Sequence, residues 1–186
     1  MKLLLKVIPF LFLIPSFASA GQGQVSAKLG TWAFDVSGTS NSTESASGIG
    51  AYAFEVGYSF FPKVLFVFGF NLVMSDLISG SAGYGLDLGA RYYLLSDSGT
   101  YEQSSEFTDI TIQEKWRPYI GLAMRQRLFG LALSTSYFGP GLSFGLDYSL
   151  TSKWFLTTEI RYDYLYGQGD TLAVQTNILL GAGLEF

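Results

Sequence analysis

The sequence predicts an all-β protein, an eight-stranded antiparallel up-and-down transmembrane β-barrel. Over many segments, residues at alternate positions separate into an apolar face and a small or polar face, which is the period of a β-strand. The chain is also hydrophobic, with a mean hydropathy of +0.29 and 17% aromatic residues. After the first twenty residues, however, no segment holds about eighteen uninterrupted apolar residues, the length that indicates a spanning helix. A closed barrel is the remaining way to cross a bilayer.

The first twenty residues have the features of a secretory signal peptide. Lys2 and Lys6 form a basic start, Val7–Ile14 is an apolar run, and Ala18–Ala20 supplies small residues of the kind that signal peptidase accepts. The apolar run is too short for a membrane anchor, which needs about twenty residues. We therefore expect residues 1–20 to be cleaved before Gly21.

Residues 21–186 have a length that suits one domain, which we expect to be the barrel. Without Lys2 and Lys6, 9 of the 11 basic residues remain against 15 acidic ones, a net charge of −6. Such an acidic chain is a poor binder of nucleic acid. There is no Cys and no His, so we expect neither disulfides nor a metal or other cofactor.

Eight segments carry the alternation, and the last of them is the clearest, with Val174, Ile178 and Leu180 on its apolar face. The predicted strands are Gln22–Val36, Ile49–Phe61, Val64–Met74, Tyr84–Tyr92, Trp116–Arg127, Leu142–Tyr148, Trp154–Tyr164 and Ala173–Phe186. An even number of strands, beginning at eight, is typical of bacterial barrels.

The parity of the first strand is open. Its apolar positions are odd-numbered as far as Leu29, but Trp32 and Phe34 then place them at even numbers. A β-bulge near Gly30 would reconcile the two halves.

The connections should alternate between two sides of the membrane. With the N-terminus in the periplasm, the outer loops are Ser37–Ser47, Ser75–Ser81, Leu128–Gly139 and Gly167–Thr171. The periplasmic connections are Phe61–Lys63, Ser96–Glu114 and Thr151–Lys153. The Ser/Thr-rich, acidic Ser96–Glu114 is a long exposed connection on the side where turns are usually short.

We expect the bulky apolar face to meet lipid, since the other face is rich in Gly, Ala and Ser and fits a narrow interior. The residues expected to face lipid are Tyr52, Phe54, Phe66, Phe68, Phe70, Phe144, Ile178 and Leu180. Aromatic belts are expected at both membrane interfaces. The periplasmic belt holds Phe60, Phe61, Tyr92, Tyr93, Trp116, Tyr148, Trp154 and Phe186, and the outer belt holds Tyr137, Phe138, Tyr162, Tyr164 and Tyr166.

The inward face then carries charges of both signs in close balance. The expected lumen network consists of Glu55, Asp87, Arg91, Arg117, Arg125, Asp147, Glu159, Arg161, Asp163 and Glu185, with Arg127 on the same face and Lys28 if it points inward. Isolated charges in a confined interior are costly, so we expect these groups to pair and to pack the lumen. A polar conduit or proton path along the same groups is the alternative.

Three stretches resemble the small outer-membrane β-barrel family of Gram-negative bacteria, of the OmpA-transmembrane, OmpX and OmpW type. They are DLGARYYL (Asp87–Leu94), WRPYIGLAM (Trp116–Met124) and LLGAGLEF (Leu179–Phe186). The resemblance implies insertion into the outer membrane by the barrel-assembly machinery, with Leu184 and Phe186 as the assembly signal. Lipid-A-modifying and proteolytic barrels rely on a catalytic His, which this chain lacks, so we expect no enzyme.

The sequence thus favours a non-enzymatic integral outer-membrane barrel with a packed, charge-balanced lumen. It would act structurally or through contacts with outer-membrane lipids, other protomers or a partner, and a homo-oligomer stays open. The alternative is a narrow OmpW-like conduit for small hydrophobic molecules, motivated by the apolar character of Leu128–Gly139.

Overall fold

A computed structural model describes the backbone of residues 22–37, 43–74, 83–95, 101–105, 108–112, 114–129, 135–169 and 171–186. Its strands are β1 (Gln22–Ser37), β2 (Thr43–Phe61), β3 (Val64–Val73), β4 (Gly83–Tyr93), β5 (Tyr101–Ser105), β6 (Thr108–Ile112), β7 (Trp116–Phe129), β8 (Thr135–Ser149), β9 (Trp154–Tyr166) and β10 (Leu172–Glu185). The signal peptide predicted over residues 1–20 lies outside the described residues.

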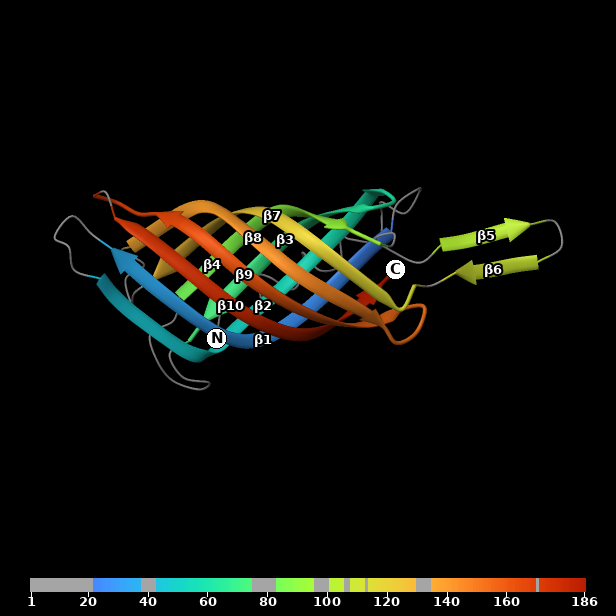
Figure 1. Ribbon diagram of the computed structural model, residues 1–186, viewed down its shortest axis with the longest axis horizontal. Coiled ribbons are helices and arrows are strands. Elements are labelled where there is room, and N and C mark those ends of the chain that lie inside the picture. Colours follow the sequence, from blue (N-terminus) through green and yellow to red (C-terminus); the bar gives the residue numbers. More distant parts are fainter. Residues whose placement is uncertain are drawn as a thin grey trace, which may run out of the picture.

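Eight of these strands close into an antiparallel barrel, as predicted (Figure 1). Their order around the barrel is β1-β10-β9-β8-β7-β4-β3-β2. The first and last strands pair from Gln24↔Glu185 to Ser37↔Leu172. Their ends are joined by reciprocal backbone hydrogen bonds of 2.9 Å between Gly23 and Phe186. The barrel strands have 10 to 19 residues, enough to cross a bilayer at a tilt, which takes roughly nine to eleven.

The barrel has two ends that differ in their connections. We call the end at which β1 begins and β10 ends the terminal end, and the opposite one the far end. At the terminal end, β5 and β6 form a separate two-stranded sheet that projects beyond the barrel (Figure 1). Ser96–Glu114 does connect two barrel strands, β4 and β7, at the terminal end, but the sequence did not predict the two strands within it. Strands of five residues in a Ser/Thr-rich segment lack the long apolar alternation from which the other strands were predicted.

At the far end, two predicted loops are shorter than expected because the strands continue into them. Thr43–Ser47 belongs to β2 and pairs with β1, and Thr135–Gly139 belongs to β8 and pairs with β7. Backbone hydrogen bonds hold a hairpin together whatever its side chains, so the strands extend through the polar Thr43–Ser47 and through Thr135–Gly139 alike. The turn predicted over Gly167–Thr171 is present, with a 2.8 Å hydrogen bond from Gly167 N to Thr171 O.

The bulge expected near Gly30 exists, but on the neighbouring strand. Gly30 pairs with Ala51 and Thr31 pairs with Ile49, so Gly50 is the extra residue. Its φ of 143° suits glycine far better than other residues. The bulge reverses the facing of β2, whereas β1 keeps one parity throughout. Trp32 and Phe34 consequently face inward, on the side of Lys28.

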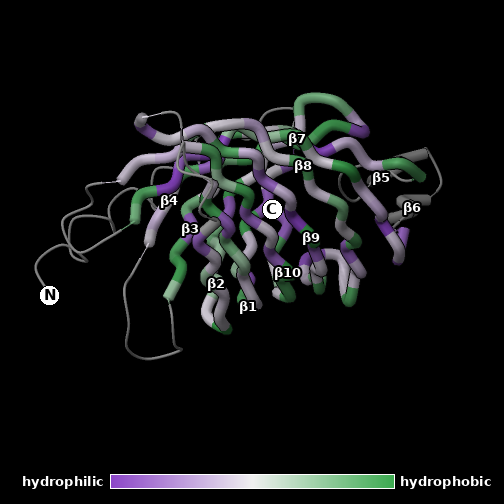
Figure 2. The backbone as a smooth tube through the Cα atoms, turned by 60° about the vertical axis from the view of Figure 1, so that its left-hand side comes forward, coloured by the Kyte–Doolittle hydropathy of each residue, from purple (hydrophilic) through white to green (hydrophobic). Residues whose placement is uncertain are grey.

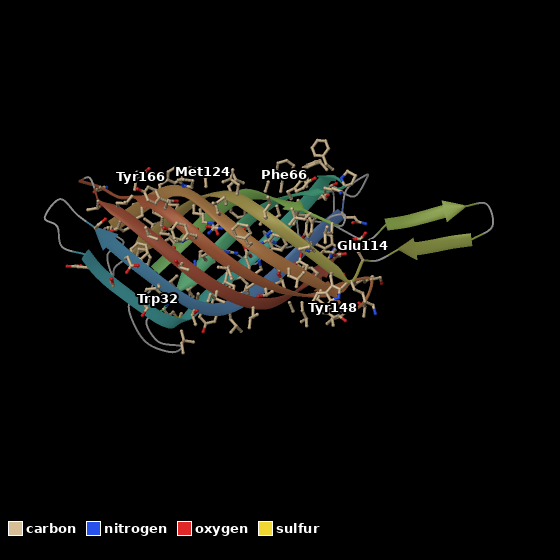
Figure 3. All side chains as sticks on the ribbon, in the orientation of Figure 1. Trp32, Phe66, Glu114, Met124, Tyr148 and Tyr166 are labelled. Atoms are coloured by element: carbon tan, nitrogen blue, oxygen red, sulfur yellow. The ribbon has the colours of Figure 1, made fainter. Side chains whose placement is uncertain are left out.

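Hydrophilic and hydrophobic residues alternate along the barrel strands (Figure 2). Phe66, Met124 and Tyr166 lie on the outside of the barrel (Figure 3). The outward positions form a continuous apolar surface, whereas most buried side chains are polar or charged. This distribution is the inverse of a soluble barrel, which keeps its apolar face inside.

Candidate functional site: the filled lumen

The interior of the barrel is lined by charged side chains that come from seven of its eight strands. All ten residues of the expected network are at most 8% exposed: Glu55, Asp87, Arg91, Arg117, Arg125, Asp147, Glu159, Arg161, Asp163 and Glu185. Lys28 and Arg127 are buried with them. Six acidic groups therefore face six basic ones, and the lumen is neutral as a whole.

A first cluster lies around the carboxylates of Glu55 and Glu159, which β2 and β9 place in the middle of the lumen. Lys28 Nζ is 2.7 Å from Glu55 Oε2 and also contacts Glu159. Arg91 bridges the same two carboxylates, with its Nη2 3.0 Å from Glu159 Oε2. Arg161 contacts Glu55, and its Nε donates to Glu159 Oε1 at 3.1 Å. Three cations thus share two anions.

A second cluster lies nearer the far end around Asp87 and Asp163. Arg127 joins these carboxylates, with Nη1 2.6 Å from Asp87 Oδ1 and Nη2 3.2 Å from Asp163 Oδ2. Arg125 contacts Asp163 as well. Arg161 links the second cluster to the first, because its Nη1 lies 3.2 Å from Asp87 Oδ2. Asn71 accepts from the same Arg161 nitrogen at 2.8 Å.

A third group of polar side chains lies at the terminal end of the lumen. Arg117 pairs with Glu185, and its guanidinium lies over the ring of Tyr93, 5.8 Å from the centroid. The Tyr93 hydroxyl donates to Asp147 Oδ2 at 2.7 Å. Tyr93 is fully buried, so its predicted place in the periplasmic aromatic belt was wrong. Tyr93 shares the odd parity of Asp87 and Arg91, and this signal in the sequence was sufficient to predict its inward facing, although it was not used.

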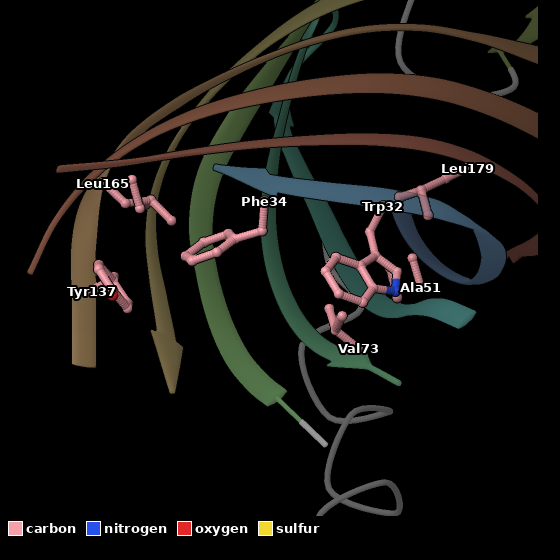
Figure 4. Close-up of a cluster of buried hydrophobic side chains, with 9 residues drawn as sticks. Trp32, Phe34, Ala51, Val73, Tyr137, Leu165 and Leu179 are labelled. Atoms are coloured by element: carbon pink, nitrogen blue, oxygen red, sulfur yellow. The ribbon is translucent and has the colours of Figure 1, made fainter. Parts of the chain in front are cut away.

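Beyond the second cluster, the far part of the lumen is apolar, which the sequence did not lead us to expect (Figure 4). Its buried cluster consists of Trp32, Phe34, Ala51, Ala53, Val73, Tyr137, Leu165, Ala173 and Leu179. Phe34 packs against Phe129 with ring centroids 4.5 Å apart and against Tyr137 at 5.3 Å. Trp32 Nε1 donates to Met74 O at 2.8 Å. Tyr137 is only 6% exposed, so its assignment to the outer aromatic belt was also wrong.

These side chains leave little room between them. A void of about 20 Å³ lies beside Glu55, Asp87, Arg91 and Arg125, space for about one water molecule. Within the residues that the structure describes, no group of three or more His, Cys, Asp or Glu side chains is arranged to hold a metal ion. No helix in the same part of the chain has the length and apolar character to span a membrane.

The barrel wall is irregular where β8 meets β9. Phe138 pairs with Tyr166, and the next pair along the described strands is Gly141↔Asp163. Pro140 lies in this interval and has no N–H to donate. The backbones nevertheless approach closely, since a Cβ on Gly139 would lie 2.1 Å from Tyr164 O. The interval thus weakens the hydrogen-bond ladder without leaving a hole.

Of the eight residues expected to face lipid, seven are between 40% and 61% exposed: Phe54, Phe66, Phe68, Phe70, Phe144, Ile178 and Leu180. Tyr52 is half-buried. Leu184 is half-buried, and Phe186 is 59% exposed.

No family model matches the sequence, and no curated protein matches it either. Solved structures do match. Neisserial surface protein A has a TM-score of 0.59 at 18% identity, covering 90% of this chain and 98% of its own. The N-terminal β-barrel domain of Pseudomonas aeruginosa OprF has a TM-score of 0.55 at 16% identity, covering 89% and 99%. The outer membrane protein OprG from the same organism has a TM-score of 0.50 at 14% identity, covering 90% and 97%.

At these identities the similarity concerns the fold. It agrees with the closed order of the eight barrel strands and with the outward apolar surface described above. The chain has the fold of the small outer-membrane β-barrels, as the resemblance implied.

Proposed function

We propose that the protein is a non-enzymatic integral barrel of the bacterial outer membrane whose lumen is sealed. It acts through its outer surface and its loops, by contacts with lipid, with other protomers or with a partner. The single observation that carries the proposal is the filling of the lumen by paired charges at its centre and by apolar clusters on either side of them.

The outward surface supports the membrane part of the proposal. Large apolar side chains such as Phe68, Leu88 and Phe144 are 53% to 66% exposed on strands that would span the hydrocarbon region. Exposure of that kind over a whole barrel is unfavourable in water and favourable in lipid. The terminal end then lies in the periplasm, with Leu184 and Phe186 as the signal for the barrel-assembly machinery and residues 1–20 removed on export.

The filling of the lumen supports the sealed part. Eight strands enclose an interior that side chains can fill completely. Each buried carboxylate of the two central clusters has at least two basic partners, so desolvation of these charges is offset by pairing and by hydrogen bonds. Without His in the chain, the lumen also lacks the usual general base, so the charges serve packing rather than catalysis.

Planar-bilayer recordings test this proposal. Purified protein inserted into a bilayer should show no steady conductance of small ions at moderate voltage. A steady ohmic channel, seen in repeated insertions, would overturn it.

A second candidate function is a narrow path for small hydrophobic molecules that enter sideways from the membrane. Two observations favour it: the apolar far part of the lumen around Trp32 and Phe34, and the gap in pairing at Pro140. A Pro140→Val variant would restore a backbone donor to the wall at a position that suits a strand former. Uptake of a small hydrophobic solute that falls in this variant would support the path, whereas equal uptake with and without the protein would exclude it.

Association between protomers is tested separately by native mass measurement with lipid retained. The lipid-facing Phe66, Phe68 and Phe70 would also serve as a contact between copies. A clean monomer would leave lipid as their partner.

A further inference from the structure

The exposed cations of the protein are confined to one end of the barrel. Beyond residues 1–20 there are nine basic residues, and six of them, Lys28 and the five arginines, are buried in the lumen. The other three, Lys63, Lys115 and Lys153, are exposed. The four far-end connections, 38–42, 74–82, 130–134 and 167–171, contain no Lys or Arg.

The three lysines occupy equivalent positions. Each immediately precedes a strand that leaves the terminal end: β3, β7 or β9. The backbone carbonyls of Lys63, Lys115 and Lys153 accept hydrogen bonds from the neighbouring strand, with distances of 2.9, 2.9 and 2.8 Å. In the barrel order, β4 separates β3 from β7, and β8 separates β7 from β9. The lysines therefore lie at one height on every second strand of an arc of the rim.

Aromatic side chains beside these lysines indicate their depth in a membrane. Trp116 and Trp154 follow Lys115 and Lys153 directly and are 61% and 51% exposed. Phe61, two residues before Lys63, is 59% exposed. Trp side chains prefer the interface between hydrocarbon and headgroups. A lysine next to an interfacial Trp can extend its ammonium to the level of the lipid phosphates.

The described side chains do not pair with these charges. No ion pair among the described side chains includes Lys63, Lys115 or Lys153, since the twelve pairs all lie in the lumen. Glu114 is exposed next to Lys115, so the three sites are not identical in their surroundings.

We propose that Lys63, Lys115 and Lys153 bind the phosphate groups of anionic phospholipids in the leaflet that meets the terminal end. The inference rests on the proposed function, because it requires the barrel to lie in a membrane with that end at the periplasmic leaflet. Ammonium groups near a membrane surface favour anionic over neutral lipids. The far rim, without any basic residue, makes no such selection, so the protein distinguishes lipids at one end only.

Quenching of tryptophan fluorescence by brominated lipids measures the preference for anionic lipid at the rim that carries the lysines. Trp116 and Trp154 adjoin two of the lysines, whereas Trp32 is in the lumen and only 9% exposed. The protein is folded into phosphatidylcholine vesicles that contain brominated phosphatidylglycerol or, at the same mole fraction, brominated phosphatidylcholine. At low salt we expect phosphatidylglycerol to be enriched about two- to five-fold at the tryptophans. The enrichment should decrease at high salt.

Two matched triple variants isolate the charge. The variant K63Q/K115Q/K153Q should lower the enrichment to about one-fold, and K63R/K115R/K153R should retain it. Far-UV circular dichroism checks that each variant has the β-sheet content of the parent. If the triple Gln variant does not fold, K115Q and K153Q are measured singly, each beside its own tryptophan.

The possible results separate the inference from the proposed function. The phosphate contact would be overturned by equal quenching by the two brominated lipids. It would also be overturned by a preference for phosphatidylglycerol that persists in the Gln variants. The lysines would then contact water or an acidic periplasmic partner. Absence of quenching by both lipids would contradict membrane insertion itself.

Discussion

The centre of the lumen is held by charges, whereas its far part is held by apolar volume. Around Glu55 and Glu159, every buried anion meets several guanidinium or ammonium groups. Around Trp32 and Phe34, aromatic and aliphatic side chains pack on one another. Substitutions should destabilise the two parts in different ways. The charged part is sensitive to the loss of an ion-pair partner even when side-chain volume is kept. The apolar part is sensitive to lost side-chain volume.

The largest effect is expected for Arg161→Met, which keeps an apolar stem of similar length and removes the charge. Arg161 contacts Glu55, Asp87 and Glu159 and is 1% exposed. Its loss leaves buried carboxylates with too few partners, so the free energy of unfolding should fall by about 4 kcal/mol. Urea unfolding from vesicles measures it. Ile160→Leu, on the adjacent outward position, should change it by less than about 1.5 kcal/mol, and equal effects of the two variants would contradict the account.

In the apolar part, Trp32→Ala should lower the free energy of unfolding by about 3 kcal/mol. The substitution opens a cavity and removes the hydrogen bond to Met74 O. Trp32→Phe keeps most of the volume and should cost about 1 kcal/mol. Urea unfolding from vesicles measures both variants. If Trp32→Phe lowered the free energy of unfolding as much as Trp32→Ala, the stability of the apolar part would not depend on side-chain volume.

At the terminal end, Tyr93→Phe removes a single hydroxyl. That hydroxyl donates to the fully buried Asp147, so its loss should lower the free energy of unfolding by about 1.5 kcal/mol. The neighbouring Tyr92 is 46% exposed on the outside, and Tyr92→Phe should change the stability by less than about 0.5 kcal/mol. If the two variants changed the free energy of unfolding equally, the hydrogen bond from Tyr93 to Asp147 would not stabilise the protein.

The smallest of the four stability effects is expected at Gly50, where the bulge reverses the facing of β2. Gly50→Ala should lower the free energy of unfolding by about 1 kcal/mol, because Ala strongly disfavours a φ of 143°. Gly48→Ala on the same strand is the control and should be close to neutral. If both were neutral in urea unfolding, the bulge would not depend on glycine.

Sequence alternation was sufficient to predict the barrel and the inward facing of its charges. Asp87, Arg91 and Arg161 interrupt otherwise apolar strands at fixed parity, and only a barrel interior holds such groups away from lipid. The pairing partners did not follow, because they depend on strand order and register. Lys28 and Glu159, for example, meet although they are 131 residues apart in the chain.

The apolar far part of the lumen was missed for a different physical reason. An apolar side chain is acceptable both in lipid and in a packed interior, so Trp32 and Phe34 carry no information on their facing by themselves. Parity counted from Lys28 on the same strand places them inside, and parity counted from Asp147 does the same for Tyr137. Charged neighbours therefore indicate the facing of aromatic residues more reliably than position near a strand end.

If the lumen is sealed as we propose, its charged part and its apolar part act as seals in series, and ion conductance in planar bilayers tests this most directly. Arg161→Ala opens space in the charged part of the lumen, and Trp32→Ala opens space in the apolar part. The account predicts no steady conductance for the parent or for either single variant, and a steady channel for a folded Trp32→Ala/Arg161→Ala double variant. Steady conductance through the parent, or a single variant that conducts as well as the double, would contradict it.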